Sequence, residues 1–295
     1  MDLDSFIITA FCLLDDALRD GARHARLRQR GPAPVLADSE VLTIEVVGEY
    51  LGLDQDQALY AFFRRHYAHF FPGLHRVHRT TFLRQAANLW RVKEQLWQHL
   101  VAQIPDDPSL ALVDSFPVPV CQFARAYRCR RFRGDAAYGK DTLVRQTFYG
   151  FRVHVRVTWP GVMTRIAVAP ANVAELELVP GLTGGTRGLL VGDRNYWHPP
   201  LAETLARQDL ALLTPYRWAS RDPAPERSAL LSRFRYRIDT VFGQLVERYH
   251  VKRVWARDGW HFQSRLLRKV LSHTLVVYLN GTLHRPLLHL ASLVV

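Results

Sequence analysis

The stretch "ALVDSFPVPV" (Ala111–Val120) decides the fold class, because it reads as a buried strand with an acid at its end. An apolar run leads to Asp114, and two prolines then interrupt the run. A short, unbroken apolar run is typical of a strand that is covered on both faces of its sheet. The stretch "GLLVGDRNYW" (Gly188–Trp197) repeats the pattern, since its apolar residues lead to Asp193. Ligand-binding groups of such sheets gather at the strand ends, so we expect the two carboxylates to lie within a few ångströms of each other.

The chain around these two strands alternates between strand and helix patterns. The runs "TFYGFRVHVRVTW" and "VMTRIAVAP" flank Pro160-Gly161, which predicts a β-hairpin. Further along, "PPLAETLARQ" is typical of a helix and "LALLTPY" of a strand, and the polar residues 217–229 indicate a loop. Two long helices are expected over residues 230–250 and 262–280. The sequence therefore predicts an α/β domain, a mixed sheet flanked by helices, over residues 106–295.

Residues 1–105 have helical patterns throughout, so we expect an all-α N-terminal domain. Helices are predicted over 4–18, 36–53, 54–71 and 78–97, with Ser39 as an N-cap and Gly52 near a helix end. A basic linker is expected over 23–34. Short helices joined by tight polar turns fit either a helix-turn-helix DNA-binding domain or an ordinary helical bundle, and the pattern does not choose between them.

A third acid is expected on the predicted helix 230–250. Its apolar stripe packs on the sheet and consists of Phe234, Ile238, Val241, Phe242, Leu245 and Tyr249. At about 100° per residue, Asp239 lies about 105° from the centre of the stripe, on its flank, and Glu247 lies about 180° away, towards solvent. The flank favours Asp239 as the third acid, while Glu247 has the longer side chain and stays the alternative.

Three carboxylates in one place would repel each other, and one of them would be pushed towards protonation. Divalent cations remove this repulsion, and hard cations with oxygen ligands indicate Mg²⁺ or Mn²⁺. Two such ions about 4 Å apart support phosphodiester chemistry, because they activate the nucleophile and stabilise the leaving oxygen. The pattern of acids thus points to an enzyme that cuts or joins nucleic acid strands.

The charge of the chain agrees with a nucleic acid partner. Lys and Arg number 39 against 27 acids among 295 residues, a formal net charge of +12, and this excess favours a polyanionic partner. Three cysteines without a paired spacing exclude a disulfide framework and fit a reducing compartment. The apolar run near the N-terminus is too short to span a membrane. We expect a cytoplasmic protein without a membrane partner.

Basic residues near the acids are candidates for DNA contact. Arg194 and Asn195 directly follow the second acid, where they are suited to steer a phosphate. A second group interleaves arginines with Tyr127 and Phe132, which suits backbone contact and base stacking, although a solvated loop is the alternative. The arginines of that group are Arg128, Arg130, Arg131 and Arg133.

Five stretches of the chain together resemble the IS982-type insertion-sequence transposases, which are DDE transposases of ribonuclease H-like fold. They are "LVDSFPVPVC", "RCRRFRGDAAYG", "FYGFRVHVRVTWPG", "GDRNYW" and "RYRIDTVFGQL". The similarity extends into "RLLRKVLSHTL" and "LADSEVLTIEVVGEYLG", so it covers nearly all of the chain.

The resemblance implies a ribonuclease H-like catalytic domain with two Mg²⁺ ions that cleaves and transfers the terminal DNA strands of an insertion sequence. It places the first two acids on Asp114 and Asp193. The third acid of the family is usually a Glu in an "R-x-x-I-E-T" context, which reads "RIDT" here and falls on Asp239. The resemblance also implies partners: double-stranded DNA with terminal inverted repeats, target DNA, and a second copy of the chain on paired ends. Two alternatives stay open, a metal-dependent nuclease without strand transfer and a catalytically dead DNA-binding regulator.

Overall fold

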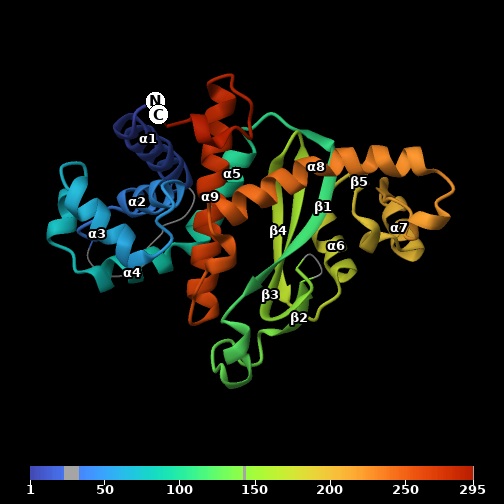
Figure 1. Ribbon diagram of the computed structural model, residues 1–295. Coiled ribbons are helices and arrows are strands. Elements are labelled where there is room, and N and C mark those ends of the chain that lie inside the picture. The colour runs from blue at the N-terminus through green and yellow to red at the C-terminus, as the bar shows by residue number, and fades with distance from the viewer. Residues whose placement is uncertain (23–32, 142–143, 295) are drawn as a thin grey trace. The chain divides into compact units, whose positions relative to one another are not determined.

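The computed structural model describes residues 1–22, 33–141 and 144–294 of the chain (Figure 1). Most of the expected linker 23–34 lies outside these residues. The chain forms two compact units. The first unit joins Met1–Gln103 to Leu245–Val295, and the second unit is the continuous segment Ile104–Gln244. As functional domains, the ranges 1–105 and 106–295 stay a prediction.

The second unit is built on a mixed six-stranded sheet. Strand β1 lies at its centre, antiparallel to β3 on one side and parallel to β5 on the other, while β6 continues beyond β5. Strands β2 and β4 both pair with the far side of β3. The strands are β1 (Asp107–Pro119), β2 (Ala137–Asp141), β3 (Gln146–Trp159), β4 (Val162–Pro170), β5 (Gly188–Val191) and β6 (Leu210–Leu213).

Strand β1 is buried on both faces, as its apolar run predicts. Ala111, Leu112 and Val113 are all fully buried, and successive side chains of a strand point to opposite faces. Ala111 and Val113 pack in one core cluster with residues of α6 (Glu175–Thr183) and α7 (Pro199–Ala206). Those two helices therefore cover one face of the sheet.

Helix α8 (Pro225–Glu247) covers the other face (Figure 1). Phe242 meets Phe116 of β1 edge to face, with 5.0 Å between the ring centroids. Phe116 lies three residues from Val113, so the alternation of the strand turns it away from α6 and α7. The sheet flanked by helices, preceded by an N-terminal helical region, confirms the α/β fold class that the sequence predicts.

The predicted hairpin between β3 and β4 is present. Gly161 follows Pro160 in the turn and has a φ of +139°, a backbone conformation that residues other than glycine rarely adopt. Two neighbouring expectations need correction. The stretch expected as a loop over 217–229 ends in helix, because α8 already begins at Pro225, where proline is tolerated in the first turn. Helix α6, which contains Pro180, was not predicted from the sequence.

The first unit is a bundle of helices. Helix α9 packs against α5, α2 and α4, and its residues from Leu266 to Val277 are all buried, so it is the central helix of the unit. The helices are α1 (Leu3–Ala22), α2 (Asp38–Tyr50), α3 (Asp56–His66), α4 (Arg79–Asn88), α5 (Trp90–Val101) and α9 (Gly259–Thr282). The first unit also contains the short 3₁₀ segments η1 (Pro72–His75), η5 (Val251–Arg253) and η6 (Leu290–Ser292), and the second unit contains η2 (Phe123–Arg128), η3 (Arg194–Tyr196) and η4 (Ala219–Arg221).

Two details of the N-terminal helices differ from the sequence prediction. Ser39 is not the N-cap of α2; the N-cap is Ala37, and its backbone N–H donates to the Glu40 carboxylate at 2.6 Å. The helix predicted over 78–97 is two helices, because Leu89 leaves helical geometry between α4 and α5. In the described part of the chain, no helix is long and apolar enough to cross a membrane.

A network of buried charges joins the helices of the first unit. Lys269 of α9 contacts Glu49 of α2 at 2.7 Å, and Lys93 of α5 contacts Glu45 of α2 at 2.6 Å. Arg268 of α9 lies between the two glutamates and pairs with both. Buried charges are tolerated when they are paired in this way, and the pairing fixes which helices meet. The members are Glu45, Glu49, Asp56, Lys93, Arg268 and Lys269.

Candidate active site

Asp114 lies on β1 with its side chain 16% exposed. Arg235 of α8 donates from Nη2 to its Oδ2 at 2.7 Å, and the backbone N–H of Ser115 donates to its Oδ1 at 2.8 Å. Burial raises the pKa of Asp114 to about 7, and the nearby Asp193 adds to this rise while Arg235 opposes it. The first acid predicted from sequence is therefore a largely buried carboxyl with one strong cationic partner.

Asp193 lies just beyond β5, in the N-cap position of the η3 turn. Asn195 binds both of its carboxylate oxygens, with the backbone N–H at 2.8 Å from Oδ1 and Nδ2 at 2.9 Å from Oδ2. Gly192 allows this tight turn, because a Cβ there would lie only 2.8 Å from the Cβ of Tyr196. The second predicted acid is thus held in one orientation by its own turn.

Asp239 lies on α8, one helical turn after Arg235, with its side chain exposed. Its carboxyl is still partly shielded from water, and this partial burial raises its pKa. Asp193 raises the pKa further, and Arg235 lowers it. Burial lowers the pKa of Arg235, yet Asp114, Asp193 and Asp239 together raise it above its usual value. Of the three aspartates, only Asp114 contacts Arg235 directly, while Asp193 and Asp239 act on its charge electrostatically.

Glu247 is placed differently. It is exposed in the last turn of α8, about 12 Å along the helix from Asp239. It belongs to the first compact unit, whereas the three aspartates belong to the second. The second unit alone therefore assembles its acids without Glu247.

A fourth acid, Glu175, lies near the aspartates and was missed by the sequence analysis. Its Oε1 accepts from Ser115 Oγ at 2.9 Å and from Arg152 Nη1 at 2.8 Å. Burial raises its pKa, hydrogen bonding to Ser115 and the charge of Arg152 lower it, and Asp193 raises it. Glu175 is the first residue of α6. Because this helix was not predicted, Glu175 was not recognised as a candidate site residue.

The arginines proposed for DNA contact lie on the surface. All four members of the group 128–133 are exposed, and the guanidinium of Arg128 lies 5.6 Å from the ring centre of Tyr127, which is 77% exposed. Arg194 is exposed as well, whereas the amide of Asn195 is engaged with Asp193. Phe132, which was predicted with Tyr127 as a stacking residue, is buried against Phe151 and is not available to a base. The exposed pair of Arg128 and Tyr127 is available to a ligand, and a role of this loop in nucleic acid contact stays a prediction.

The chemistry of the acid cluster fits a hard divalent cation, but its arrangement is not a closed metal site. Within residues 1–22, 33–141 and 144–294, no three Asp, Glu, His or Cys side chains are grouped so that they could hold a metal ion. The donors are carboxylate oxygens, the ligands that Mg²⁺ and Mn²⁺ prefer. Asp193 raises the pKa of Asp114, Asp239 and Glu175 alike, so the acids repel each other in a way that bound cations relieve.

Residues 106–257, which contain all of these aspartates and more than half of the chain, match the family described as "Transposase DDE domain". The chain belongs to the DDE transposase family. Members of this family act on DNA and typically use divalent metal ions. No curated protein and no solved structure matches the chain significantly. The mixed sheet, its flanking helices and the N-terminal helical region are compatible with the fold of a DDE transposase.

Proposed function

We propose that this DDE transposase is of the IS982 type and that it cleaves and transfers DNA strands at the ends of an insertion sequence. The observation that carries the proposal is that Asp114, Asp193 and Asp239 all lie inside the matched domain, where each of them raises the pKa of Arg235. In the proposal these aspartates are the ligands of two Mg²⁺ or Mn²⁺ ions. The partners are double-stranded DNA with terminal inverted repeats and target DNA, and the protein acts in the cytoplasm as a homodimer on paired ends.

The cations supply activation of the attacking oxygen and stabilisation of the leaving oxygen. The residues of the chain prepare the site for this chemistry. Asn195 and the η3 backbone orient Asp193, while the backbone N–H of Ser115 orients Asp114. Such support matters because a displacement of a metal-ligating group by about 1 Å lowers the reaction rate strongly.

Arg235 has two roles in the proposal. In the structure it pairs with the largely buried carboxyl of Asp114. Its planar guanidinium also fits a phosphodiester group with two parallel hydrogen bonds. When DNA enters, Arg235 exchanges the carboxylate for a phosphate oxygen, which frees Asp114 to act as a ligand.

A second candidate function rests on the shortened third acid. Asp239 lacks one methylene relative to the Glu that the resemblance leads us to expect, and the described acids form no three-ligand cluster. These observations favour a DNA-binding regulator that does not cut. A nuclease that cuts without joining is the remaining alternative.

One assay separates the three functions. The full chain is incubated with Mg²⁺ and labelled duplexes that carry the inverted repeats bordering its gene. Strand transfer into a second DNA supports the transposase, cutting without joining supports the nuclease, and specific binding without cutting supports the regulator.

A further inference from the structure

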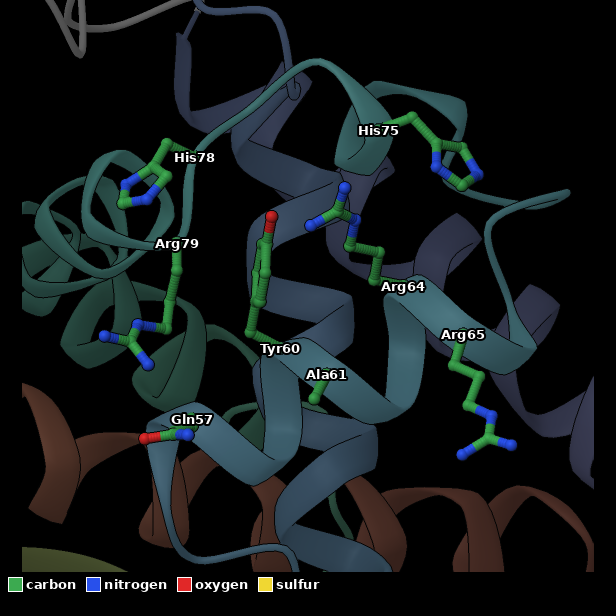
Figure 2. A pocket seen from close by; sticks show the side chains of 8 residues that line it. All are labelled: Gln57, Tyr60, Ala61, Arg64, Arg65, His75, His78 and Arg79. Atoms are coloured by element: carbon green, nitrogen blue, oxygen red, sulfur yellow. The ribbon is translucent and has the colours of Figure 1, made fainter.

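A basic hollow lies within the first unit, whereas the three aspartates of the candidate active site belong to the second unit. It has a volume of about 690 Å³ and lies between α3, the η1 turn and the start of α4 (Figure 2). Its α3 residues follow helical spacing, so they come from one face of that helix. The lining residues are Gln57, Tyr60, Ala61, Arg64, Arg65, His75, His78 and Arg79.

The charged residues that line the hollow are all basic. Five of its eight lining residues are arginine or histidine, and none is an acid. Among the residues that the structure describes, Arg64, Arg65 and Arg79 have no carboxylate partner. This differs from the buried network of the same unit, where every cation faces a carboxylate. Pockets of this size for small ligands are mostly apolar, so this lining favours an anion instead.

The hollow is fixed in shape by Tyr60 at its centre. Tyr60 is buried, and its hydroxyl donates to the carbonyl of Val77 at 2.7 Å, which holds the segment between η1 and α4 against α3. The guanidinium of Arg64 lies 5.9 Å from the centre of the Tyr60 ring, and Figure 2 shows the two side chains next to each other. Arg64 is therefore held at the hollow before a ligand arrives.

His78 contributes a defined donor. It is the N-cap of α4, and its Nδ1 accepts from the backbone N–H of Thr80 at 3.3 Å. Since Nδ1 accepts, the neutral ring carries its proton on Nε2, which is then a hydrogen-bond donor. The lining thus combines positive charge with N–H donors, a combination suited to phosphate oxygens.

We propose that this hollow binds the phosphate backbone of duplex DNA. The choice of DNA rests on the proposed function, whereas the preference for phosphates comes from the hollow itself. Its arginines come from two helices, α3 and α4, which suits several phosphates along a strand better than one small anion. The contact positions the DNA and does not read its sequence, because phosphate contacts carry no base information.

The test compares two double variants of the full chain that remove the same charge. Arg64→Ala/Arg79→Ala empties the hollow of two cations. Arg84→Ala/Arg91→Ala removes two exposed arginines of the same unit that do not line it. Binding to labelled duplexes of about 30 base pairs is measured without metal over a range of salt concentrations. One duplex carries the terminal repeats and the other is of unrelated sequence.

The hollow variant should bind both duplexes at least roughly tenfold more weakly at low salt, and its salt slope should decrease by about 1 for each arginine. The control variant should stay within roughly twofold of the wild type, since it leaves the hollow intact. Arg64→Lys/Arg79→Lys should restore the salt slope, because each lysine keeps the charge. Unchanged melting temperatures establish that the variants are folded.

Equal losses in the two alanine variants would overturn the proposal, since overall charge would then explain them. An unchanged salt slope in the hollow variant would overturn it too. These outcomes are independent of the proposed strand transfer. A wild type that binds through the hollow but never cuts refutes only the transposase activity, and a hollow variant that binds and cuts normally refutes only the hollow.

Discussion

Arg235 donates to Asp114 across 2.7 Å from a position one helical turn before Asp239. The same segment of α8 therefore carries both the cation that neutralises the acid of β1 and the acid expected to complete the set. Any movement of this segment changes the partner of Asp114 and the position of Asp239 together.

Replacement of Asp114 or Asp193 should abolish cleavage and spare DNA binding. Asp114→Asn or Asp193→Asn removes one proposed ligand charge and leaves the basic surfaces intact. We expect metal-dependent cleavage to fall at least about 10³-fold, measured with terminal-repeat DNA, while affinity for the same DNA stays near the wild-type value. Cleavage near the wild-type rate in either variant would remove that aspartate from the site.

The third acid is tested by three variants of α8. Asp239→Ala should be as inactive as Asp114→Asn, whereas Glu247→Gln should keep most of the activity, because only Asp239 lies with the other acids. Asp239→Glu should stay active, since it restores the arm length implied by the resemblance. The Mg²⁺ requirement of each variant is the measurement. An inactive Glu247→Gln beside an active Asp239→Ala would reverse the assignment.

The raised pKa of Asp114 predicts a dependence of stability on pH. The folded state holds this proton up to about pH 7, whereas an unfolded Asp releases it near pH 4. The stability that Asp114 contributes is therefore present below about pH 4 and is lost as the pH rises through about 7. Asp114→Asn stays neutral at every pH, so without metal its melting temperature should exceed that of the wild type at pH 8.

At pH 5 that difference in melting temperature should be smaller. Addition of Mg²⁺ should stabilise the wild type more at pH 8 than at pH 6, because a proton on Asp114 competes with the cation. A difference between wild type and Asp114→Asn that does not change with pH would show that another group carries the effect.

Glu175 should act as a positioning residue. Its carboxylate holds Ser115, the neighbour of Asp114, and Arg152 of β3. Glu175→Gln leaves Arg152 without its carboxylate and should lower the free energy of unfolding by about 1–3 kcal/mol. Glu203→Gln, at an exposed position of α7, should change it little. Thermal unfolding measures both effects.

If Glu175 also sets the position of Asp114, Glu175→Gln should raise the Mg²⁺ concentration needed for half-maximal cleavage. Glu175→Asp should recover part of the stability and of the metal response, because it keeps the charge. A loss of stability with an unchanged Mg²⁺ requirement would restrict Glu175 to the fold.

Local patterns in the sequence predicted the two acid-bearing strands and the stripe of α8. The expectation that the first strand ends at Asp114 was wrong, because β1 keeps its pairing with β3 through Asp114 to Pro119. The run before Asp114 and the run before Asp193 each form a strand as predicted, because an unbroken apolar run has few alternatives to a buried strand. Asp239 lies on the flank that the helical geometry gives, since its angle depends only on residues within the same helix.

Contacts between segments that are far apart in the chain could not be predicted from the sequence. Nothing in the spacing of Arg235 and Asp114 shows that they meet, because the ion pair depends on how α8 lies on the sheet. Helix α6 was missed because Pro180 and Gly181 act as helix breakers in local propensity, and tertiary packing of Val179 and Leu182 overrides them. The hollow of the first unit likewise requires α3 and α4 to be placed together before its arginines form a group.

The discontinuity of the first unit has a consequence for synthesis of the protein. Ile104–Gln244 can complete its sheet while the C-terminal residues are still on the ribosome, since domains fold as their segments emerge. The N-terminal helices emerge earlier but must wait, because Glu49 finds Arg268 and Lys269 only when α9 has been made. A nascent chain truncated before Leu245 should therefore expose unpaired glutamates and an incomplete helical bundle to chaperones and proteases, because the segment that follows Gln244 completes the first unit.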